Sequence, residues 1–208
     1  MVHKKEYKKK LKQLSIIEAA KVLFLEKRYN SITVDEIAKL AGLTKKTMYC
    51  YFPSKLALYI HIFEDHLQKL QMELSKCLKQ DLPTDRLILS AFETFYKFSK
   101  KNEKFMLLFW QINSEDFNGD LPEELVNRIN FWNKTLITDM LEVIRKAQKE
   151  GLLIQHDPAL LVHLFSAMNK GIFVHTNKES KFHIANIKPD DLYETFVTLL
   201  KRGALLHR

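Results

Sequence analysis

The sequence predicts an all-α fold, and three observations indicate it. Apolar residues recur at intervals of three and four along most of the chain, which is helical spacing, and no stretch alternates long enough to indicate a strand. Only 5 glycines and 5 prolines occur in 208 residues, too few for the many turns of a strand-rich fold. The hydrophobic share of 46% and the charged share of 28% are typical of a globular chain with a substantial core.

The N-terminal stretch combines a lysine-rich arm with a first helix. Helical spacing gives this helix one apolar face, formed by Ile16, Ala19, Ala20, Leu23 and Phe24, and residues 29–31 end the pattern. The arm in front carries Lys4, Lys5, Lys8, Lys9, Lys10 and Lys12. Two interpretations of the arm stay open: an extension that follows phosphates or enters a minor groove, and a frayed, solvated tail.

The next segment predicts two short helices joined by a tight turn. Thr33 is expected to cap the second helix, with Glu36 completing a capping box. Gly42 is expected to end this helix in the left-handed conformation. Thr44 is expected to cap a third, very short helix that runs to about Tyr51. Two helices of about eight residues around a glycine-containing turn have the spacing of a helix-turn-helix.

Six longer helices are expected in the remainder of the chain. Gly151 ends one of them, and the pair Asp157-Pro158 is a good N-cap and first turn for the next. A break is expected at residues 118–120. The expected ranges are about 55–79, 85–100, 103–113, 122–150, 158–176 and 189–205. The full prediction is a nine-helix, two-domain chain, with an N-terminal three-helix helix-turn-helix domain over 1–55 and a C-terminal helical domain over 56–208.

The positive charge is confined to the predicted N-terminal domain. The chain has a formal net charge of +8. Residues 1–55 contain 13 basic and 5 acidic residues, whereas the rest of the chain contains 20 of each. Such a division indicates a module that binds a polyanion, joined to a neutral module.

The third helix is expected to expose cationic and hydroxyl side chains. Leu43, Met48 and Phe52 are predicted to point inward and to hold it against the first two helices. The side chains left outside are Lys45, Lys46, Thr47, Tyr49 and Tyr51. Such groups suit phosphates and the edges of DNA bases.

The segment TVDEIAKLAGLTKKTMYCYFPSK (33–55) resembles the DNA-binding domain of the TetR family. The stretch IIEAAKVLF (16–24) also resembles the first helix of that family. Two positions depart from the pattern, because Lys46 and Arg28 stand where the family often has glycine. The matching residues are Thr33, Ile37, Ala38, Ala41, Gly42, Leu43, Thr44, Thr47, Met48, Tyr49, Tyr51, Phe52 and Lys55.

The resemblance implies a role for each exposed residue of the motif. Residues at positions that usually touch the phosphate backbone are Thr33, Thr44, Tyr49, Tyr51 and Lys55. Residues at positions that usually face bases in the major groove are Lys45, Lys46 and Thr47. Whether Lys46 reads a guanine or holds a phosphate stays open, and ordinary packing of Tyr51 is an alternative to its phosphate contact.

Residues 85–133 hold ten of the 23 aromatic side chains, where the resemblance implies helices around an effector pocket. Burial of these rings in a well-packed core is the alternative to a cavity that binds a lipophilic or flat ligand. The candidates for a cavity lining are Phe92, Phe109, Trp110, Phe131 and Trp132.

The last two helices show apolar faces, and in the family this pair forms a four-helix dimer interface with its copy. Burial within one subunit is the alternative. The candidate interface residues are Leu161, Phe165, Met168, Ile172, Phe196 and Leu200. A two-fold dimer reads two half-sites, so the double-stranded DNA operator is expected to be roughly palindromic.

These expectations describe a sequence-specific regulator of transcription, a repressor that a small lipophilic or aromatic effector releases from its operator. The alternative is an architectural DNA-binding protein that is indifferent to sequence. The resemblance also implies a mechanism, in which the effector tilts the helix at about 55–79 and changes the separation of the two recognition helices.

An enzyme, a metal-binding protein, a secreted protein and a membrane protein each have less support in the sequence. No enzyme is expected, because nucleophile-elbow, Walker, HExxH and dinucleotide motifs are missing; no cofactor or metal site is expected either. Cys50 and Cys77 indicate a reducing compartment, and a redox role for Cys50 is weighed against an inert thiol. No apolar run approaches the roughly 20 residues of a membrane span, and the N-terminus does not look like a secretory signal. A cytoplasmic location without membrane contact is therefore expected.

Overall fold

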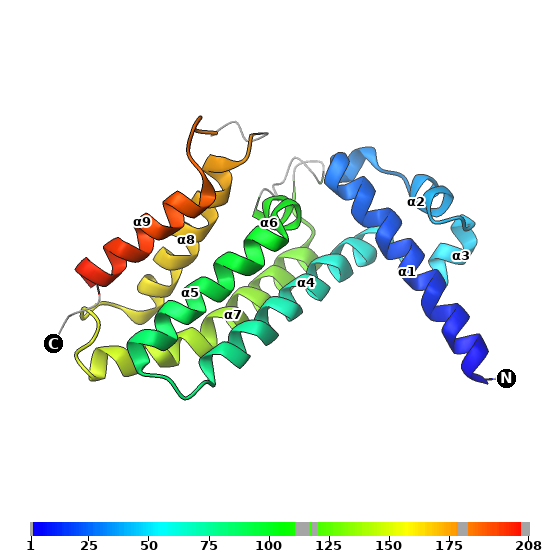
Figure 1. Ribbon diagram of the computed structural model, residues 1–208. Helices are drawn as coiled ribbons and strands as arrows, with labels where there is room; N and C mark the ends of the chain where they lie inside the picture. Colours follow the sequence, from blue (N-terminus) through cyan, green and yellow to red (C-terminus); the bar gives the residue numbers. More distant parts are fainter. Residues whose placement is uncertain (1, 111–116, 118–119, 179–182, 205–208) are drawn as a thin grey trace. The chain divides into compact units, whose positions relative to one another are not determined.

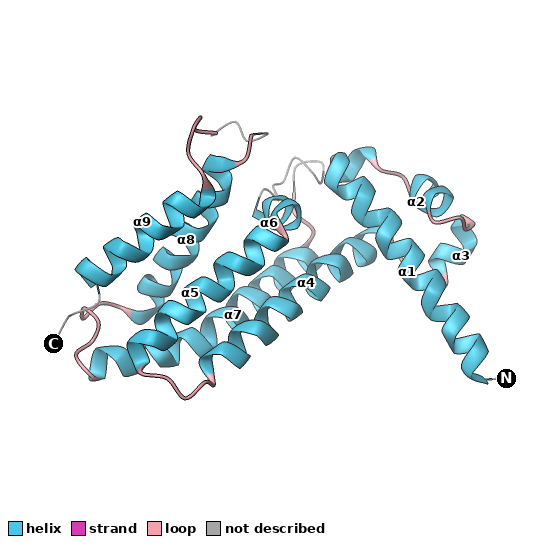
Figure 2. Ribbon diagram, in the orientation of Figure 1, coloured by secondary structure: helices cyan, strands magenta, loops and turns pink. Residues whose placement is uncertain are grey.

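The computed structural model describes residues 2–110, 117, 120–178 and 183–204. Within these ranges the chain consists of helices and connecting loops, without a strand (Figures 1 and 2). The all-α prediction is therefore confirmed. The end of the helix expected over 103–113 lies outside the described residues, as do two residues of the break expected at 118–120.

The chain divides into two compact units. One unit comprises residues 1–67 and 111–130, and the other comprises residues 68–110 and 131–208. The divisions fall inside α4 (Lys55–Leu78) and α7 (Glu123–Lys149), so each of these helices contributes to both units.

The first unit contains α1 (Val2–Glu26), a 3₁₀ turn (Tyr29–Ser31), α2 (Val34–Leu40) and α3 (Lys45–Tyr49), together with the first part of α4. Helix α2 packs against both α1 and α3. The predicted apolar face of α1 is buried, which confirms that prediction; its members are Ile16, Ala19, Ala20, Leu23 and Phe24. The core of the unit also holds the fully buried side chains of Ile37 and Met48.

The lysine-rich arm is the beginning of α1. The helix starts at Val2 and continues without a break to Glu26, so the arm is helical and not a frayed tail; its contact with phosphates or a minor groove stays a prediction. Residues 4–14 contain neither glycine nor proline and are rich in good helix formers, so nothing separates the arm from the amphipathic helix behind it. The side chains of Lys4, Lys8, Lys9, Lys10 and Lys12 are exposed.

The second unit is built around α8 (Pro158–Thr176), which packs against α5 (Thr84–Lys101), α6 (Glu103–Trp110) and α9 (Pro189–Leu199). Figure 1 shows α8 and α9 side by side. A π-helical turn at Leu200–Ala204 follows α9. Residues 131–149 of α7 and residues 68–78 of α4 complete the unit.

Two polar connections fix the helices of the second unit. In the core, the side-chain amide of Asn169 on α8 donates to the hydroxyl of Ser99 on α5 at 2.9 Å, and both groups are buried. At the start of α9, Asp190 accepts from the hydroxyl of Tyr96 at 2.6 Å and from the ammonium of Lys100 at 2.7 Å. A carboxylate in the first turn of a helix is also favoured by the helix dipole.

Several predicted helix ends are confirmed. The Asp157 side chain accepts from the amide of Ala159, with Pro158 in the first turn of α8. Gly151, which follows α7, has a φ of 70°. None of the described helices is both long and apolar enough to cross a membrane.

Candidate nucleic-acid interface and ligand cavity

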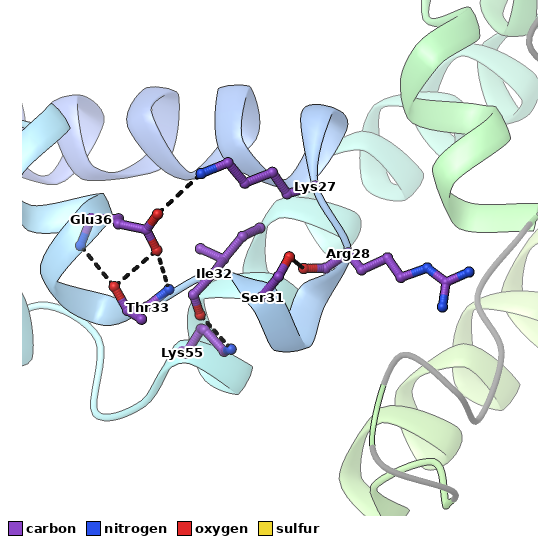
Figure 3. Close-up of polar contacts among 7 residues, drawn as sticks. All are labelled: Lys27, Arg28, Ser31, Ile32, Thr33, Glu36 and Lys55. Carbon is purple, nitrogen blue, oxygen red and sulfur yellow. Dashed lines mark hydrogen bonds and ion pairs between the residues drawn. The ribbon is translucent and has the colours of Figure 1, made fainter.

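The capping box at the start of α2 is formed as predicted. The Thr33 hydroxyl accepts from the Glu36 amide at 3.1 Å, and the Glu36 carboxylate accepts from the Thr33 amide at 2.7 Å (Figure 3). At the other end, Gly42 adopts a φ of 68°, where a side chain is strained and glycine is favoured. The amide of Leu43 then donates to the carbonyl of Ala38 at 2.9 Å. These contacts set the turn between α2 and α3.

Helix α3 has one side in the core and one side on the surface. The Thr44 hydroxyl caps it by accepting from the Thr47 amide at 3.2 Å. Met48 is fully buried and Phe52 is 5% exposed, which confirms their predicted inward position; Leu43 is half-buried. Of the predicted outer set, Lys45, Lys46 and Tyr49 are exposed, and Thr47 and Tyr51 are half-buried. The predicted DNA-contacting residues of α3 therefore lie on one accessible turn of helix.

Carboxylates accompany the lysines of this surface. The ammonium of Lys45 donates to Asp35 on α2 at 2.7 Å, and this contact raises the pKa of Lys45. The Lys27 ammonium donates to Glu36 at 3.0 Å (Figure 3). The backbone amide of Thr33 and, after it, Lys27 lower the pKa of Glu36 to about 2. These acids were not predicted as partners.

Lys55, predicted to touch phosphate, makes its contacts inside the protein. Its ammonium donates to the carbonyl of Tyr29 at 2.8 Å and to the carbonyl of Ile32 at 2.7 Å; Figure 3 shows it beneath Ile32. The same nitrogen lies 4.0 Å from the centroid of the Tyr29 ring. Burial lowers the pKa of Lys55, while the charge of Glu36 acts in the opposite direction.

Tyr29 is the centre of an aromatic cluster that the sequence did not predict. Its ring centroid lies 5.9 Å from Phe24, 5.0 Å from Tyr59 and 4.4 Å from Phe117. Burial raises the pKa of Tyr29 to about 12. Phe117 lies within residues 85–133, where the resemblance implies an effector pocket, but it belongs to the first unit and packs in this cluster. Periodicity carries no signal for this contact, because the two residues are far apart in the sequence.

The second unit contains a partly open cavity of about 250 Å³ that is lined by residues of α4, α5, α7 and α8. Most of the residues around it are apolar, and the polar ones are Asn133, His163 and Ser166. Neither a carboxylate nor a lysine or arginine is among them. The lining consists of Leu70, Leu74, Ala91, Phe92, Phe95, Asn133, Leu136, Ile137, Met140, Val162, His163, Phe165 and Ser166. Such a lining suits a lipophilic molecule with a few hydrogen-bonding groups.

Of the five aromatic residues expected to line a cavity, Phe92 does so. Phe109, Trp110, Phe131 and Trp132 are not part of this lining. Trp110 packs on a core cluster that contains Phe173. Phe131 is 52% exposed and packs edge-on against Trp132. Aromatic content alone does not indicate which ring faces an internal space.

The residues expected at a dimer interface divide into two groups. Leu161, Phe165, Ile172 and Leu200 are buried within their own subunit, so they offer no open surface. Met168 is 38% exposed and Phe196 is half-buried. Large apolar side chains that are exposed on α8 and α9 are Leu160 at 63%, Leu164 at 55% and Leu199 at 63%. Helical spacing predicted apolar faces correctly but did not predict which residues the subunit itself covers.

The histidines and cysteines were also considered as metal ligands or reactive groups. Among the described residues, no group of histidine, cysteine and carboxylate side chains is arranged to hold a metal ion. Both cysteines are free thiols, with Cys50 exposed and Cys77 buried. The Cys50 thiol donates to the carbonyl of Lys46 at 3.3 Å.

Comparison with known sequences places the first unit among bacterial regulators. Residues 16–62 match the family model described as bacterial regulatory proteins, tetR family. The transcriptional activator FasR of Mycolicibacterium smegmatis is 30% identical over 40% of this chain and 38% of its own length. The regulator YhgD of Bacillus subtilis is 26% identical over 70% of this chain and 73% of its own. The negative regulator IcaR of Staphylococcus aureus is 29% identical over 51% and 57%.

Solved structures extend the similarity of fold to both units. FadR from Bacillus subtilis in complex with stearoyl-CoA superposes with a TM-score of 0.74 at 17% identity, over 93% of this chain and 99% of that one. AibR in complex with isovaleryl coenzyme A and operator DNA gives a TM-score of 0.72 at 15% identity, over 90% and 97%. At such identities the likeness is one of fold.

Proposed function

The chain belongs to the TetR family of bacterial transcriptional regulators, and from this premise we propose that it is a sequence-specific, dimeric repressor. In this proposal residues 1–55 bind a palindromic operator, and residues 56–208 bind the effector and form the dimer. A small lipophilic effector releases the protein from the operator. IcaR, a negative regulator, supports repression, whereas FasR is an activator, so the direction of control needs its own test.

The observation that carries the proposal is the arrangement of α3. Its buried Met48 anchors the helix, Thr44 caps its N-terminus, and Lys45, Lys46 and Tyr49 are exposed along it. Cations and hydroxyls in that position suit a major groove and its phosphates. The proposed phosphate contacts are Thr33, Thr44, Tyr49 and Tyr51, and the proposed base contacts are Lys45, Lys46 and Thr47.

The proposed effector is an acyl compound. The lining of the cavity in the second unit is mostly apolar and contains no carboxylate, which suits an acyl chain and disfavours an organic cation. FadR and AibR, which share the fold, were solved in complex with acyl-coenzyme A molecules. Helix α4 lines this cavity with Leu70 and Leu74 and begins at Lys55 beside the recognition motif. A ligand that shifts α4 at the cavity would therefore act on the same helix that begins beside the recognition motif.

The proposed dimer interface is the exposed apolar stripe of α8 and the end of α9. Leu160, Leu164 and Met168 recur at intervals of four along α8, so they share one helix face. Leu199 is exposed on α9. Phe165 and Leu200 were also predicted for this interface, but they are buried and pack inside the subunit.

Selection of genomic fragments tests the DNA-binding proposal. Fragments of the source genome are incubated with purified protein, the bound fragments are recovered, and the enriched sites are footprinted. One palindromic sequence with half-sites about 10 base pairs apart is the expected result. Binding that weakens with salt but enriches no sequence would contradict the proposal and favour an architectural DNA-binding protein. A reporter placed behind the enriched site separates repression from activation.

A chain-length series of acyl-coenzyme A compounds tests the effector. Addition to the protein–DNA complex is expected to release DNA in wild type. Ala91→Leu fills part of the cavity, so this variant is expected to bind DNA normally and to release it less readily. Release that is equal in both proteins would place the effector elsewhere.

A further inference from the structure

The ammonium of Lys55 is surrounded by groups of its own subunit. A lysine ammonium has three N–H donors. Two contacts, of 2.8 and 2.7 Å, lead to the carbonyls of Tyr29 and Ile32, and the face of the Tyr29 ring lies 4.0 Å away. A cation over an aromatic face is held by the ring quadrupole. This arrangement occupies the directions in which the ammonium would otherwise approach a phosphate.

The two carbonyls belong to the turn from which the recognition motif starts. Tyr29 opens the 3₁₀ turn, and Ile32 directly precedes Thr33, the N-cap of α2. Lys55 is the first residue of α4. One side chain therefore ties the beginning of α4 to the beginning of α2. Ile32 is 1% exposed, so its backbone is part of the packed core.

Burial argues for a structural role of the same contact. The Lys55 side chain is half-buried, and desolvation lowers its pKa. Removing a charge from water is unfavourable unless hydrogen bonds compensate for the lost hydration. The two carbonyls provide such compensation in the absence of DNA, whereas the exposed Lys46 stays in water.

We propose that Lys55 is a positioning residue for operator recognition. It holds the turn at residues 29–32 against α4, so that α2 and α3 keep their orientation, and it does not itself neutralise a phosphate. The inference rests on the proposed function, because its readout is DNA binding.

The two roles differ in their dependence on salt. A lysine that neutralises a phosphate releases a counterion, and its loss reduces the slope of log K against log salt by about 0.9 for each phosphate. A positioning residue leaves the number of neutralised phosphates unchanged. Its loss weakens binding by the same factor at every salt concentration.

The test compares Lys55→Met with Lys76→Met. Lys76 is an exposed lysine near the end of the same helix, so both variants lose one positive charge. The probe is the duplex selected by the wild-type protein, titrated at several salt concentrations of roughly 50 to 300 mM. For Lys55→Met we expect about tenfold weaker binding at every salt concentration, with the wild-type slope, and for Lys76→Met we expect wild-type affinity. A slope that falls by about 0.9 or more, with affinities that converge at high salt, would overturn the proposal.

A measurement on the wild-type protein covers the case in which Lys55→Met does not fold. In ¹⁵N-lysine-labelled protein, the Lys55 ammonium is expected to exchange slowly enough to give a resonance without DNA, and to keep its shift when the duplex is added. Lys55→Arg assigns the resonance. A Lys55 signal that appears or moves only with DNA would show a phosphate contact. Wild-type protein that retains no duplex at all would instead contradict the proposed function.

Discussion

At the scale of single residues, the proposed recognition surface carries carboxylates that are expected to compete with DNA for its lysines. Asp35 holds the ammonium of Lys45, and both side chains are largely exposed. Exposed ion pairs contribute little to stability because water screens them. We expect a larger effect on the proposed DNA binding, since Lys45 would have to leave Asp35 before it could reach a base or a phosphate.

Replacing Asp35 with asparagine is expected to strengthen DNA binding several-fold at low salt. The substitution frees Lys45 from its ion pair and removes a negative charge from a surface that approaches phosphates. Titration of a labelled duplex measures the change. Glu142→Gln, on the exposed side of α7, is the control for a change in net charge alone. Equal or weaker binding by Asp35→Asn would show that the pair itself orients Lys45.

Glu36 predicts a dependence of stability on pH. Its pKa is about 2 in the folded chain and 4.5 without the fold, so its contribution is fully present above pH 4.5 and is lost as the pH falls toward 2. Compared with wild type, Glu36→Gln is therefore expected to be less stable at neutral pH, and the difference is expected to shrink below pH 4.5. Urea unfolding at a series of pH values measures it. A difference that stays constant down to pH 2.5 would contradict a role for the ionised carboxylate.

At the scale of helices, the features predicted best from the sequence are those that depend on contacts between residues close together in the chain. The structure contains the predicted capping box of Thr33 and Glu36 and the predicted cap at Asp157. Gly42 has the predicted positive φ. Each depends on contacts within a few residues, so the local sequence contains the whole interaction. The same applies to the buried face of α1, because helical periodicity fixes it.

The sequence predicted least well what depends on distant partners. Lys55 bonds to backbone carbonyls, which every residue has, so no residue type marks its partner. Leu161 and Leu164 are both leucines on α8, yet one is 5% and the other 55% exposed. Which of them faces the subunit depends on the position of α5 and α9, and one sequence does not contain that information.

The buried pair between α5 and α8 is expected to stabilise the second unit. Asn169→Ala leaves the buried Ser99 hydroxyl without this donor, which costs about 1–3 kcal/mol of unfolding free energy. Urea denaturation measures the loss, and Asn130→Ala, at an exposed position of α7, serves as the control. A further Ser99→Ala substitution is expected to recover part of the stability, because no unpaired hydroxyl then remains. Full stability of Asn169→Ala would show that water or another group replaces the amide.

At the scale of the whole molecule, operator affinity is expected to depend on the stripe of α8. Leu164→Arg places a charge at the centre of the proposed interface, so the variant is expected to be monomeric. Loss of the second half-site then weakens binding to a palindrome by about 100-fold or more. Sedimentation and duplex titration measure the two effects.

Met72→Arg is the matched control for this prediction. Met72 is 63% exposed on α4, so an arginine there tests whether any new surface charge alters assembly. A Leu164→Arg variant that still sediments as a dimer would move the interface to another face.

The unequal exposure of the two thiols makes the chain suitable for distance measurements without further engineering. A maleimide reagent reacts with accessible thiols, and Cys50 is exposed while Cys77 is buried. Cys50 is the C-cap residue of α3, so a spin label or fluorophore attached there follows the recognition helix. In a two-fold dimer on adjacent half-sites, the two labels are separated on the scale of one DNA turn, about 34 Å. That separation lies within the range of pulsed dipolar spectroscopy, so the same label reports the spacing before and after an effector is added.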